Sequence, residues 1–329
     1  MKAVFTTTVT EKIKDYLLEN VNPKVEFIFP ENIEEENLIS LSKDAEIIVA
    51  PRFLETILRS SPKVKLVQIP WIGVQNVTEI VKKYPNVLLA NNHGNAKSAA
   101  QYSVAMLLCL TNNLIQAHQM INEGKWENRL DLHFTNNFED KIIGVIGTGA
   151  IGNFVAEMLK PFVKAVYGLK RTKPQIKLSN FDKIYTIKNK SDFFKEVDSV
   201  IVTLPLTEKT KDFISEKELR LLGRKGFIVN VGRGEVINEK ALFTALKEKL
   251  ICGAGIDVWY KYRVEKNTEG KSYPFNLPFQ ELENILMSPH RAGPTRDKPH
   301  YWKDVVENFN RLAKGRTDLL NLVDLEEGY

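Results

Sequence analysis

The chain has 329 residues, of which 43% are hydrophobic and 26% are charged. This length allows two domains with sizeable cores, and the composition is that of a soluble globular protein. The net charge of +5 comes from 46 basic and 41 acidic residues that are mixed along the chain, so we expect no nucleic-acid partner. No apolar run reaches the length of a membrane span, and the first residues lack a signal-peptide core. We therefore expect no membrane partner and a cytoplasmic location.

Both cysteines, Cys109 and Cys252, lie in apolar segments. We interpret them as small buried hydrophobic residues rather than a disulfide, which fits a reducing compartment. We also expect no bound metal.

The first 90 or so residues alternate short apolar strands with amphipathic helices, which indicates a small parallel sheet flanked by helices. The turn at 70–74 follows the fourth of these strands, at the edge where open α/β sheets bind ligands. We expect strands at 3–5, 25–29, 46–50, 65–69 and 87–90, with helices at 10–19 and 53–60 among those between them.

Residues 95–121, rich in alanine and leucine, are predicted to form one long helix. A second alternation of strands and helices begins at residue 141, and its six expected strands complete a doubly wound dinucleotide-binding domain. A last helix at 301–314 is predicted to return to the first domain. The six strands are expected at 142–146, 165–168, 199–204, 227–230, 251–257 and 285–287.

The stretch KIIGVIGTGAIG at 141–152 carries a GxGxxG motif between an expected strand and an expected helix. Gly147 allows the tight turn, Gly149 lets a pyrophosphate approach the backbone, and Gly152 lets the helix pack close to the strand. The backbone at Gly149, Ala150 and Ile151 would then present the helix N-terminus to the phosphates. This context favours dinucleotide binding over a simple tight turn.

The second strand of this domain ends without the carboxylate that binds the ribose hydroxyls of NAD. Lys170, Arg171 and Thr172 lie there instead. Such a cluster suits the 2′-phosphate of NADP, because a guanidinium can donate paired hydrogen bonds to phosphate. The alternative is a basic surface loop, so NADP is favoured and NAD remains possible.

Three further segments follow strands of this domain and carry Arg233, Asp257 and His290. Each residue alone has an ordinary structural explanation, as a surface ion-pair partner, a helix cap or a turn histidine. Together they place a cation, a carboxylate and an imidazole at the carboxyl ends of neighbouring strands, where a nicotinamide would lie.

The order and spacing of these motifs resemble the D-isomer-specific 2-hydroxyacid dehydrogenase family over nearly the whole chain. The resemblance implies an α/β protein with two doubly wound parallel-sheet domains, in which a Rossmann domain is inserted into a smaller flavodoxin-like substrate domain. The expected bounds are 1–94 and 293–329 for the substrate domain and 95–292 for the dinucleotide-binding domain. The matching segments are GTGAIG (147–152), LPLTEKT (204–210), NVGRGEVINEKAL (230–242), GAGIDVW (253–259), SPHRAG (288–293) and WIGVQNV (71–77).

The resemblance implies hydride transfer between NAD(P)H and C2 of a small 2-keto or 2-hydroxy acid. Arg233 matches the arginine that holds the carboxylate and keto oxygen, His290 the acid/base, and Asp257 the residue that orients the carboxamide. Backbone N–H groups at Ile72, Gly73 and Val74 would bind the substrate carboxylate. Further cofactor contacts are implied at Leu204, Pro205, Thr210, Val231 and Gly232.

One position departs from the family pattern. The glutamate that usually pairs with the histidine is replaced by Tyr262, and Glu265 is the nearest carboxylate that follows. Either His290 lacks an acidic partner or Glu265 substitutes for it as a catalytic residue. Without a partner, the pKa of the imidazole should be lower, and reduction should peak at lower pH.

The leading interpretation is an enzyme resembling glyoxylate and hydroxypyruvate reductases. The alternatives are a nucleotide-sensing protein of the corepressor type and a formate dehydrogenase-like enzyme, although Arg233 and His290 argue against the first and the lack of a glutamine near Tyr262 against the second. The resemblance also implies a homodimer. The sequence leaves the particular 2-keto acid open.

Overall fold

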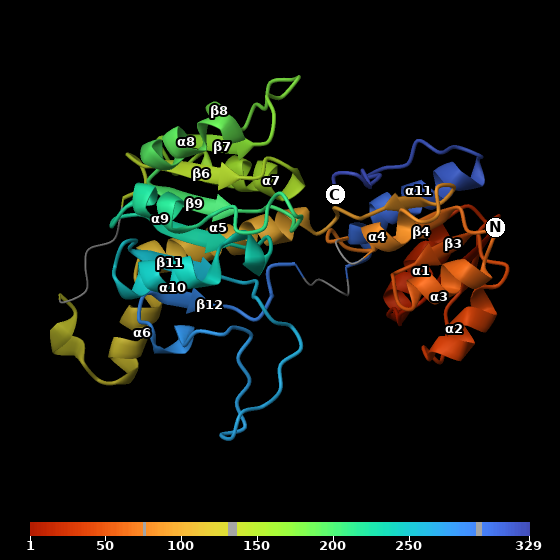
Figure 1. The fold of residues 1–329 in the computed structure, drawn as a ribbon, viewed down its shortest axis with the longest axis horizontal. Helices are drawn as coiled ribbons and strands as arrows, with labels where there is room; N and C mark the ends of the chain where they lie inside the picture. Colours follow the sequence, from red (N-terminus) through yellow and green to blue (C-terminus); the bar gives the residue numbers. More distant parts are fainter. Residues whose placement is uncertain (75–76, 131–136, 294–297) are drawn as a thin grey trace. The chain divides into compact units, whose positions relative to one another are not determined.

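The computed structural model describes residues 1–74, 77–130, 137–293 and 298–329. The chain divides into two compact units, and each is built on its own parallel sheet (Figure 1). The first unit combines Met1–Asn95 with Pro294–Tyr329, and the second is Ala96–Gly293. The dinucleotide-binding motif therefore belongs to the second unit.

The sheet of the first unit has five parallel strands in the order β2-β1-β3-β4-β5, which is the flavodoxin-like order. All three residues of β3 are buried and β-branched, as a strand covered on both faces requires. The strands are β1 (Lys2–Phe5), β2 (Glu26–Ile28), β3 (Ile47–Val49), β4 (Leu66–Gln68) and β5 (Leu88–Ala90); the helices are α1 (Glu11–Asn20), α2 (Glu35–Ser42), α3 (Leu54–Ser60), α4 (Thr78–Val81), η5 (Pro299–Trp302) and α11 (Lys303–Ala313).

Two hydrophobic clusters cover the opposite faces of this sheet. Val4 belongs to one cluster, and its neighbour Phe5 belongs to the other, because successive side chains of a strand point to opposite faces. Helices α1 and α11 contribute Leu17 and Phe309 to the cluster around Phe5.

The C-terminal segment is an integral part of the first unit. The amide of Asn308, on α11, donates to the side-chain oxygen of Gln68 at 2.9 Å and to the carbonyl of Leu320 at 3.0 Å. Leu322 forms an antiparallel bridge with Ala90, at the end of β5. Residues that follow the second unit in the sequence therefore bridge the edge strand β5 and cover one face of the first sheet.

The second unit has a seven-stranded parallel sheet in the order β12-β11-β10-β9-β6-β7-β8. From β8 to β11 this is the Rossmann order, and β12 extends it by one strand. The strands are β6 (Ile142–Ile146), β7 (Ala165–Lys170), β8 (Lys183–Thr186), β9 (Ser199–Val202), β10 (Phe227–Asn230), β11 (Gly253–Ile256) and β12 (Ile285–Met287). The helices are α5 (Ala96–Thr111), α6 (Leu114–Asn122), η1 (Trp126–Asn128), α7 (Ala150–Leu159), η2 (Ile187–Asn189), α8 (Lys190–Glu196), α9 (Glu216–Leu222), η3 (Gly234–Val236), α10 (Glu239–Lys247) and η4 (Phe279–Glu281).

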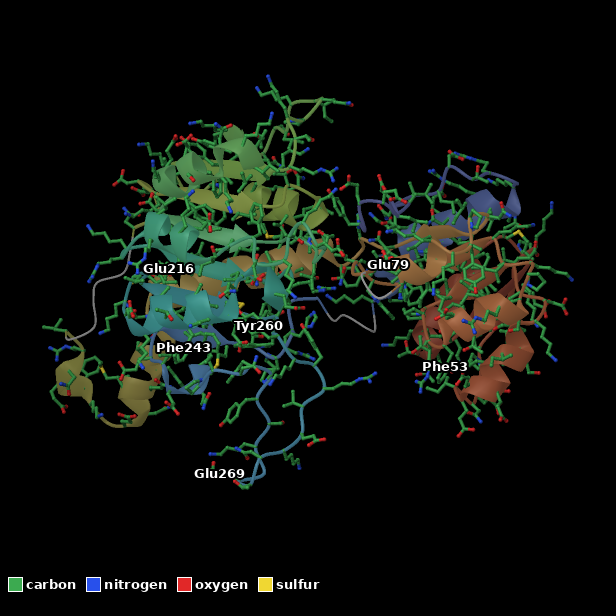
Figure 2. All side chains as sticks on the ribbon, in the orientation of Figure 1. Phe53, Glu79, Glu216, Phe243, Tyr260 and Glu269 are labelled. Atoms are coloured by element: carbon green, nitrogen blue, oxygen red, sulfur yellow. The ribbon has the colours of Figure 1, made fainter. Side chains whose placement is uncertain are left out.

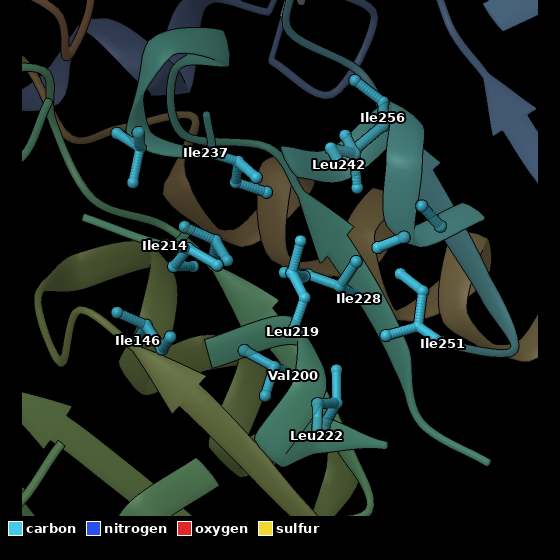
Figure 3. Close-up of a cluster of buried hydrophobic side chains, with 14 of the residues drawn as sticks. Ile146, Val200, Ile214, Leu219, Leu222, Ile228, Ile237, Leu242, Ile251 and Ile256 are labelled. Carbon is cyan, nitrogen blue, oxygen red and sulfur yellow. The ribbon is translucent and has the colours of Figure 1, made fainter. Parts of the chain in front are cut away.

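Both faces of the second sheet are also buried. Val200 and Ile228 pack with α8, α9 and α10 on one face, where Figure 3 shows Leu219 beside Ile228 and Leu242 beside Ile256. Ile201 and Val229 pack with α5 and α7 on the other face. The fold class is thus two doubly wound parallel-sheet domains, as predicted.

The sequence predicted six strands in the second unit, and its sheet has seven in the described residues. The missing strand is β8, which pairs with β7 at the edge of the sheet. Only Tyr185 of its four residues is fully buried. A short strand with so little apolar pattern resembles a loop in sequence.

The predicted single helix at 95–121 is in fact two helices, α5 and α6. Asn113 lies between them with φ 51°, in the left-handed region that asparagine tolerates better than most residues. The side chain of Asn112 donates to the carbonyl of Leu108 at 2.8 Å, so a side chain satisfies part of the helix end. Nine residues of α5 are buried, whereas α6 buries none.

The prediction that both cysteines are buried was also wrong. Cys109, on α5, is half-buried, and Cys252, just before β11, is exposed. Both are free thiols. No helix within the described ranges combines the length and the apolar character needed to cross a bilayer.

Candidate active site

The glycine-rich turn lies between β6 and α7, next to the point where the strand order reverses. Gly147 has φ +96°, and a Cβ atom there would lie 2.8 Å from the hydroxyl of Thr203. A Cβ atom on Gly152 would lie 1.9 Å from the carbonyl oxygen of Gly147. Gly149 has open space around it and precedes the first residue of α7 without a side-chain cap. No side chain of Gly149 therefore covers the first N–H groups of α7, at Ala150 and Ile151, and their contact with a pyrophosphate stays a prediction.

The strand β7 ends at Lys170, which is half-buried, and Arg171 and Thr172 follow it in exposed positions. All three residues thus lie at the carboxyl end of the strand beside β6. This is the edge where the ribose of a dinucleotide binds in this fold. The basic residues are therefore at the place that the sequence predicted, while their contact with a phosphate stays a prediction.

The loops that follow β9 and β10 pack against each other through their backbones. A Cβ atom on Gly232 would lie 2.4 Å from the carbonyl oxygen of Leu204. The hydroxyl of Thr210 donates to the carbonyl of Pro205 at 2.7 Å and accepts from the N–H of Thr207 at 2.7 Å. Thr210 thus holds the shape of its own loop.

Arg233 lies in a turn that a buried asparagine organises. Asn230, only 1% exposed, donates from its amide to the carbonyl of Arg233 at 2.9 Å and accepts from the N–H of Gly232 at 3.0 Å. The residue between them, Val231, is buried, and its N–H donates to Val202 on β9. The guanidinium is half-buried, and this burial lowers the pKa of Arg233. The guanidinium Nη1 donates to the carbonyl of Gly232 at 2.7 Å, and a cation held in this way can serve as a carboxylate or keto-oxygen ligand.

The carboxylate of Asp257 holds the loop that carries His290. It is fully buried and accepts hydrogen bonds from the hydroxyl of Ser288 at 2.5 Å and from the N–H groups of Arg291 and Ala292 at 2.6 and 2.9 Å. The N–H of His290 donates to the carbonyl of Asp257 at 2.8 Å. These bonds give Asp257 a structural role, and its predicted contact with a carboxamide stays a prediction.

Two more side chains brace the same loop through Ser288. The hydroxyl of Tyr102, on α5, lies 2.7 Å from the hydroxyl of Ser288. The indole N–H of Trp259 donates to the carbonyl of Ser288 at 2.8 Å. His290 itself has φ 54°, so its backbone adopts a conformation that the surrounding bonds must maintain.

The imidazole of His290 has two neighbours that matter for its chemistry. The ring of Tyr262 lies with its centroid 5.5 Å away at 60°, and the charge of Arg233 acts on the same imidazole. Partial burial and then Arg233 lower the pKa of His290, while Asp257 opposes them. Burial also raises the pKa of Tyr262. Arg233, His290 and Tyr262 therefore form one cluster of interacting groups.

Glu265 lies in the long loop between β11 and η4, which extends away from the sheet toward Glu269 (Figure 2). Glu265 is exposed and makes no hydrogen bond or ion pair with another described residue. The structure thus places Tyr262, and not Glu265, against His290. A catalytic role for Glu265 stays a prediction.

The turn at 70–74 follows β4 in the first unit. Ile72 and Gly73 are half-buried, and Val74 is buried in the core of that unit. The side chains of Asn91 and Asn92 donate to backbone carbonyls of this turn. The sequence did not reveal that Asn91, Asn92, Asn230 and Ser288 hold these loops by hydrogen bonds, because their partners are distant in sequence or ordinary backbone atoms.

Comparison with known proteins identifies the second unit. Residues 104–292 match the model of the D-isomer-specific 2-hydroxyacid dehydrogenase NAD-binding domain. The chain is 28% identical over 306 residues to a glyoxylate reductase of Thermococcus gammatolerans, covering 89% of this chain and 87% of the relative. It is 27% identical over 277 residues to a glyoxylate reductase of Korarchaeum cryptofilum, covering 82% and 79%.

Solved structures share the fold over the whole chain. A D-isomer-specific 2-hydroxyacid dehydrogenase from Xanthobacter autotrophicus, determined with NADPH and MES, superposes with a TM-score of 0.80 at 23% identity and covers 100% of this chain and 99% of its own. The NADPH-dependent glyoxylate/hydroxypyruvate reductase SmGhrA from Sinorhizobium meliloti gives a TM-score of 0.81 at 19% identity, with coverage of 100% and 99%. The family model spans more than half of the chain, and the motifs that it covers are those at which the structure gathers Arg233, Asp257 and His290. The chain therefore belongs to the D-isomer-specific 2-hydroxyacid dehydrogenase family and is an NAD(P)-dependent oxidoreductase that acts on the CH–OH group of 2-hydroxy acids.

Proposed function

We propose that this enzyme reduces a small 2-keto acid of the glyoxylate or hydroxypyruvate type, with His290 as the acid and Arg233 as the cation that binds the substrate. The observation that carries this proposal is the placement of Arg233 after β10 and of His290 after β12, on either side of β11, where the N–H of His290 donates to the carbonyl of Asp257 at 2.8 Å. The named relatives support the substrate class, since both are glyoxylate reductases. They also support the dehydrogenase interpretation over the corepressor-type alternative.

The bound nicotinamide supplies the hydride that adds to C2 of the keto acid. Arg233 draws electron density from the keto oxygen, and protonated His290 gives its proton to that oxygen, which becomes the hydroxyl. In the reverse direction, neutral His290 removes the hydroxyl proton. Glycines 147, 149 and 152 admit the dinucleotide, and Asp257 orients the loop of His290. The first unit supplies the N–H groups at 72–74 for the substrate carboxylate.

Steady-state kinetics with glyoxylate, hydroxypyruvate, pyruvate and phenylpyruvate, each with NADPH and NADH, test this proposal. His290→Ala should lower kcat by about a hundred- to ten-thousand-fold, because the proton donor is lost. Its Kd for the cofactor, measured by nicotinamide fluorescence, should be unchanged. His118→Ala is the matched control, since His118 is exposed on α6 of the same unit. Absence of turnover with every keto acid in the wild type would refute the proposal.

We infer a preference for NADP from Lys170, Arg171 and Thr172 at the end of β7. A hydrogen bond from a charged side chain to the 2′-phosphate contributes about 1.5–3 kcal/mol, or roughly ten- to a hundred-fold in affinity, so basic residues at this position support the preference for NADP. Arg171→Ala should raise KM for NADPH by about that factor and leave KM for NADH unchanged. Lys188→Ala, an exposed lysine of the same unit, should change neither value. An equal effect on both cofactors would contradict the preference.

We also propose that the enzyme is a cytoplasmic homodimer. Exposed apolar side chains on and after α6 support dimerisation, because such a surface favours a partner. Leu114→Asp together with Ile121→Asp should shift sedimentation from dimer to monomer. Leu18→Asp, at an equally exposed leucine of α1, is the control. The exposed apolar side chains of this surface are Leu114, Ile115, Ile121, Trp126 and Leu130.

A fractionation assay that finds the protein outside the cytoplasm would contradict the location.

A further inference from the structure

Three successive carbonyls of the turn after β4 are held by two neighbouring asparagines. The amide of Asn92 donates to Pro70 at 3.2 Å, the backbone N–H of Asn92 donates to Trp71 at 3.2 Å, and the amide of Asn91 donates to Ile72 at 2.7 Å. All of these residues belong to the first unit. The asparagines therefore bind one side of the turn.

The planarity of the peptide bond fixes what the other side presents. In a trans peptide, the carbonyl of one residue and the N–H of the next point in opposite directions. Because the carbonyls of residues 70–72 point toward Asn91 and Asn92, the N–H groups of Trp71, Ile72 and Gly73 point away from them. None of these three N–H groups donates to another described residue. Adjacent unsatisfied N–H groups of this kind form a binding site for an anionic oxygen.

The asparagines themselves are rigidly placed. Asn92 is 3% exposed, and its side chain also donates to the carbonyl of Tyr301 at 2.9 Å and accepts from the N–H of Gly94 at 3.0 Å. Asn91 is 5% exposed, and its N–H donates to Asn321. A Cβ atom on Gly94 would lie 2.1 Å from the carbonyl oxygen of Tyr301, so the backbone here packs directly against that of Tyr301. The hydrogen-bond donors of Asn91 and Asn92 are therefore held in place just after β5.

We propose that Asn91 and Asn92 are positioning residues that orient the N–H groups of residues 71–73 toward the carboxylate of the 2-keto acid. This inference rests on the proposed function, in which the N–H groups of residues 72–74 bind that carboxylate; the asparagines orient those of Ile72 and Gly73 and add that of Trp71. The side chains of Asn91 and Asn92 act only through the peptides that they hold. Their loss frees the peptides to rotate and leaves buried carbonyls without donors.

Kinetic constants of Asn91→Leu test the proposal. Leucine keeps the size of the side chain and removes the donor to Ile72. KM for glyoxylate should rise by about tenfold or more, with a smaller change in kcat and no change in KM for NADPH. Asn37→Leu is the matched control, since the amide of Asn37 donates to the carbonyl of Asn32 at 2.6 Å on the surface of the same unit. An unchanged KM for glyoxylate in a folded Asn91→Leu protein would overturn the proposal.

Oxamate binding, followed by amide resonances, separates this inference from the proposed reaction. In the wild-type enzyme with NADPH, oxamate should shift the resonances of Trp71, Ile72 and Gly73. The shifts should be lost in Asn91→Asp, which keeps the shape and replaces the donor by an acceptor. If no keto acid is reduced but the wild-type shifts occur and are lost in Asn91→Asp, the reaction is wrong and the positioning role stands; shifts that persist in Asn91→Asp refute the positioning role. If oxamate leaves the wild-type resonances unmoved, the positioning role is refuted whether or not any variant folds.

Discussion

Tyr262 occupies the position at which the family usually has a glutamate, and its ring lies against His290. The groups that act on the imidazole are therefore Tyr262, the cation of Arg233 and the carboxylate of Asp257, which is already engaged by three donors. Burial and the positive charge of Arg233 favour the neutral ring, so the pKa of His290 is below its ordinary value of 6.5. Reduction needs the protonated ring and should fall as pH rises through that lowered pKa. Oxidation, which needs the neutral ring, should persist above it.

Restoring a carboxylate at 262 should reverse this effect. In Tyr262→Glu, the negative charge stabilises imidazolium, so the fall of kcat/KM for keto-acid reduction should move to higher pH. Tyr262→Phe keeps the ring and should leave the profile in place. Glu265→Gln should also leave it in place, because Glu265 is exposed and makes no hydrogen bond or ion pair with a described residue. A profile that moves in Glu265→Gln would instead make Glu265 the partner of the histidine.

Gly149 and Gly152, two glycines of the turn, should respond differently to alanine. Gly149→Ala meets no atom within 4 Å, so the protein should fold normally while the added methyl group weakens NADPH binding. Gly152→Ala places its methyl group 1.9 Å from the carbonyl of Gly147 and should destabilise the protein as well. Thermal unfolding and cofactor titration measure the two effects separately. Equal melting temperatures for both variants would contradict the packing argument.

Among the elements, the loop after β12 depends most on a single buried carboxylate. Asp257→Asn replaces one acceptor oxygen by an amide donor that faces other donors, at a cost of about 1–3 kcal/mol in the free energy of unfolding. Because the loop carries His290, kcat should fall as well. Urea unfolding and turnover check both effects. Asp15→Asn, at an exposed position of α1, should change stability by less than about 0.5 kcal/mol, and a similarly small change in Asp257→Asn would refute the structural role.

Strong periodic segments could be predicted from the sequence, and irregular ones could not. The β6–turn–α7 unit was predictable because its glycines lie between an apolar strand and an apolar helix face. The edge strand β8 was missed because only Tyr185 is fully buried. The break at Asn113 was missed because alanine and leucine continue the helical pattern up to Thr111, and only the backbone shows the left-handed residue that ends it.

For the candidate site, the sequence could identify chemically active residues but not the residues that hold them. Arg233, Asp257 and His290 lie in motifs with recognisable spacing. Ser288 is fixed by Tyr102, which is 186 positions away, and Asn92 holds Tyr301 from 209 positions away. Contacts between residues so far apart in the sequence leave no pattern in the sequence around either residue. Only the folded backbone shows that Asn91 and Asn92 order the turn of the first unit.

At the scale of the whole molecule, each unit has its own hydrophobic core. Phe309, on α11, is fully buried among residues of the first sheet, with its ring centroid 5.8 Å from that of Phe27. Phe309→Ala should lower the free energy of unfolding by about 3–5 kcal/mol, as loss of a buried phenylalanine does. At a temperature where the variant remains folded, the Kd for NADPH should be unchanged, because the cofactor motifs lie in the second unit. A weakened Kd there would show that the two cores are not independent.

The division of the first unit between the two ends of the chain has a consequence for biosynthesis. When the ribosome has released β1 to β5, the partners of Phe27 and Gln68 on α11 have not yet been made. The dinucleotide-binding unit is translated next as one uninterrupted segment and can form its core first. The nascent segment from β1 to β5 therefore exposes the apolar face that α11 later covers. This is the stage at which a chaperone is most needed.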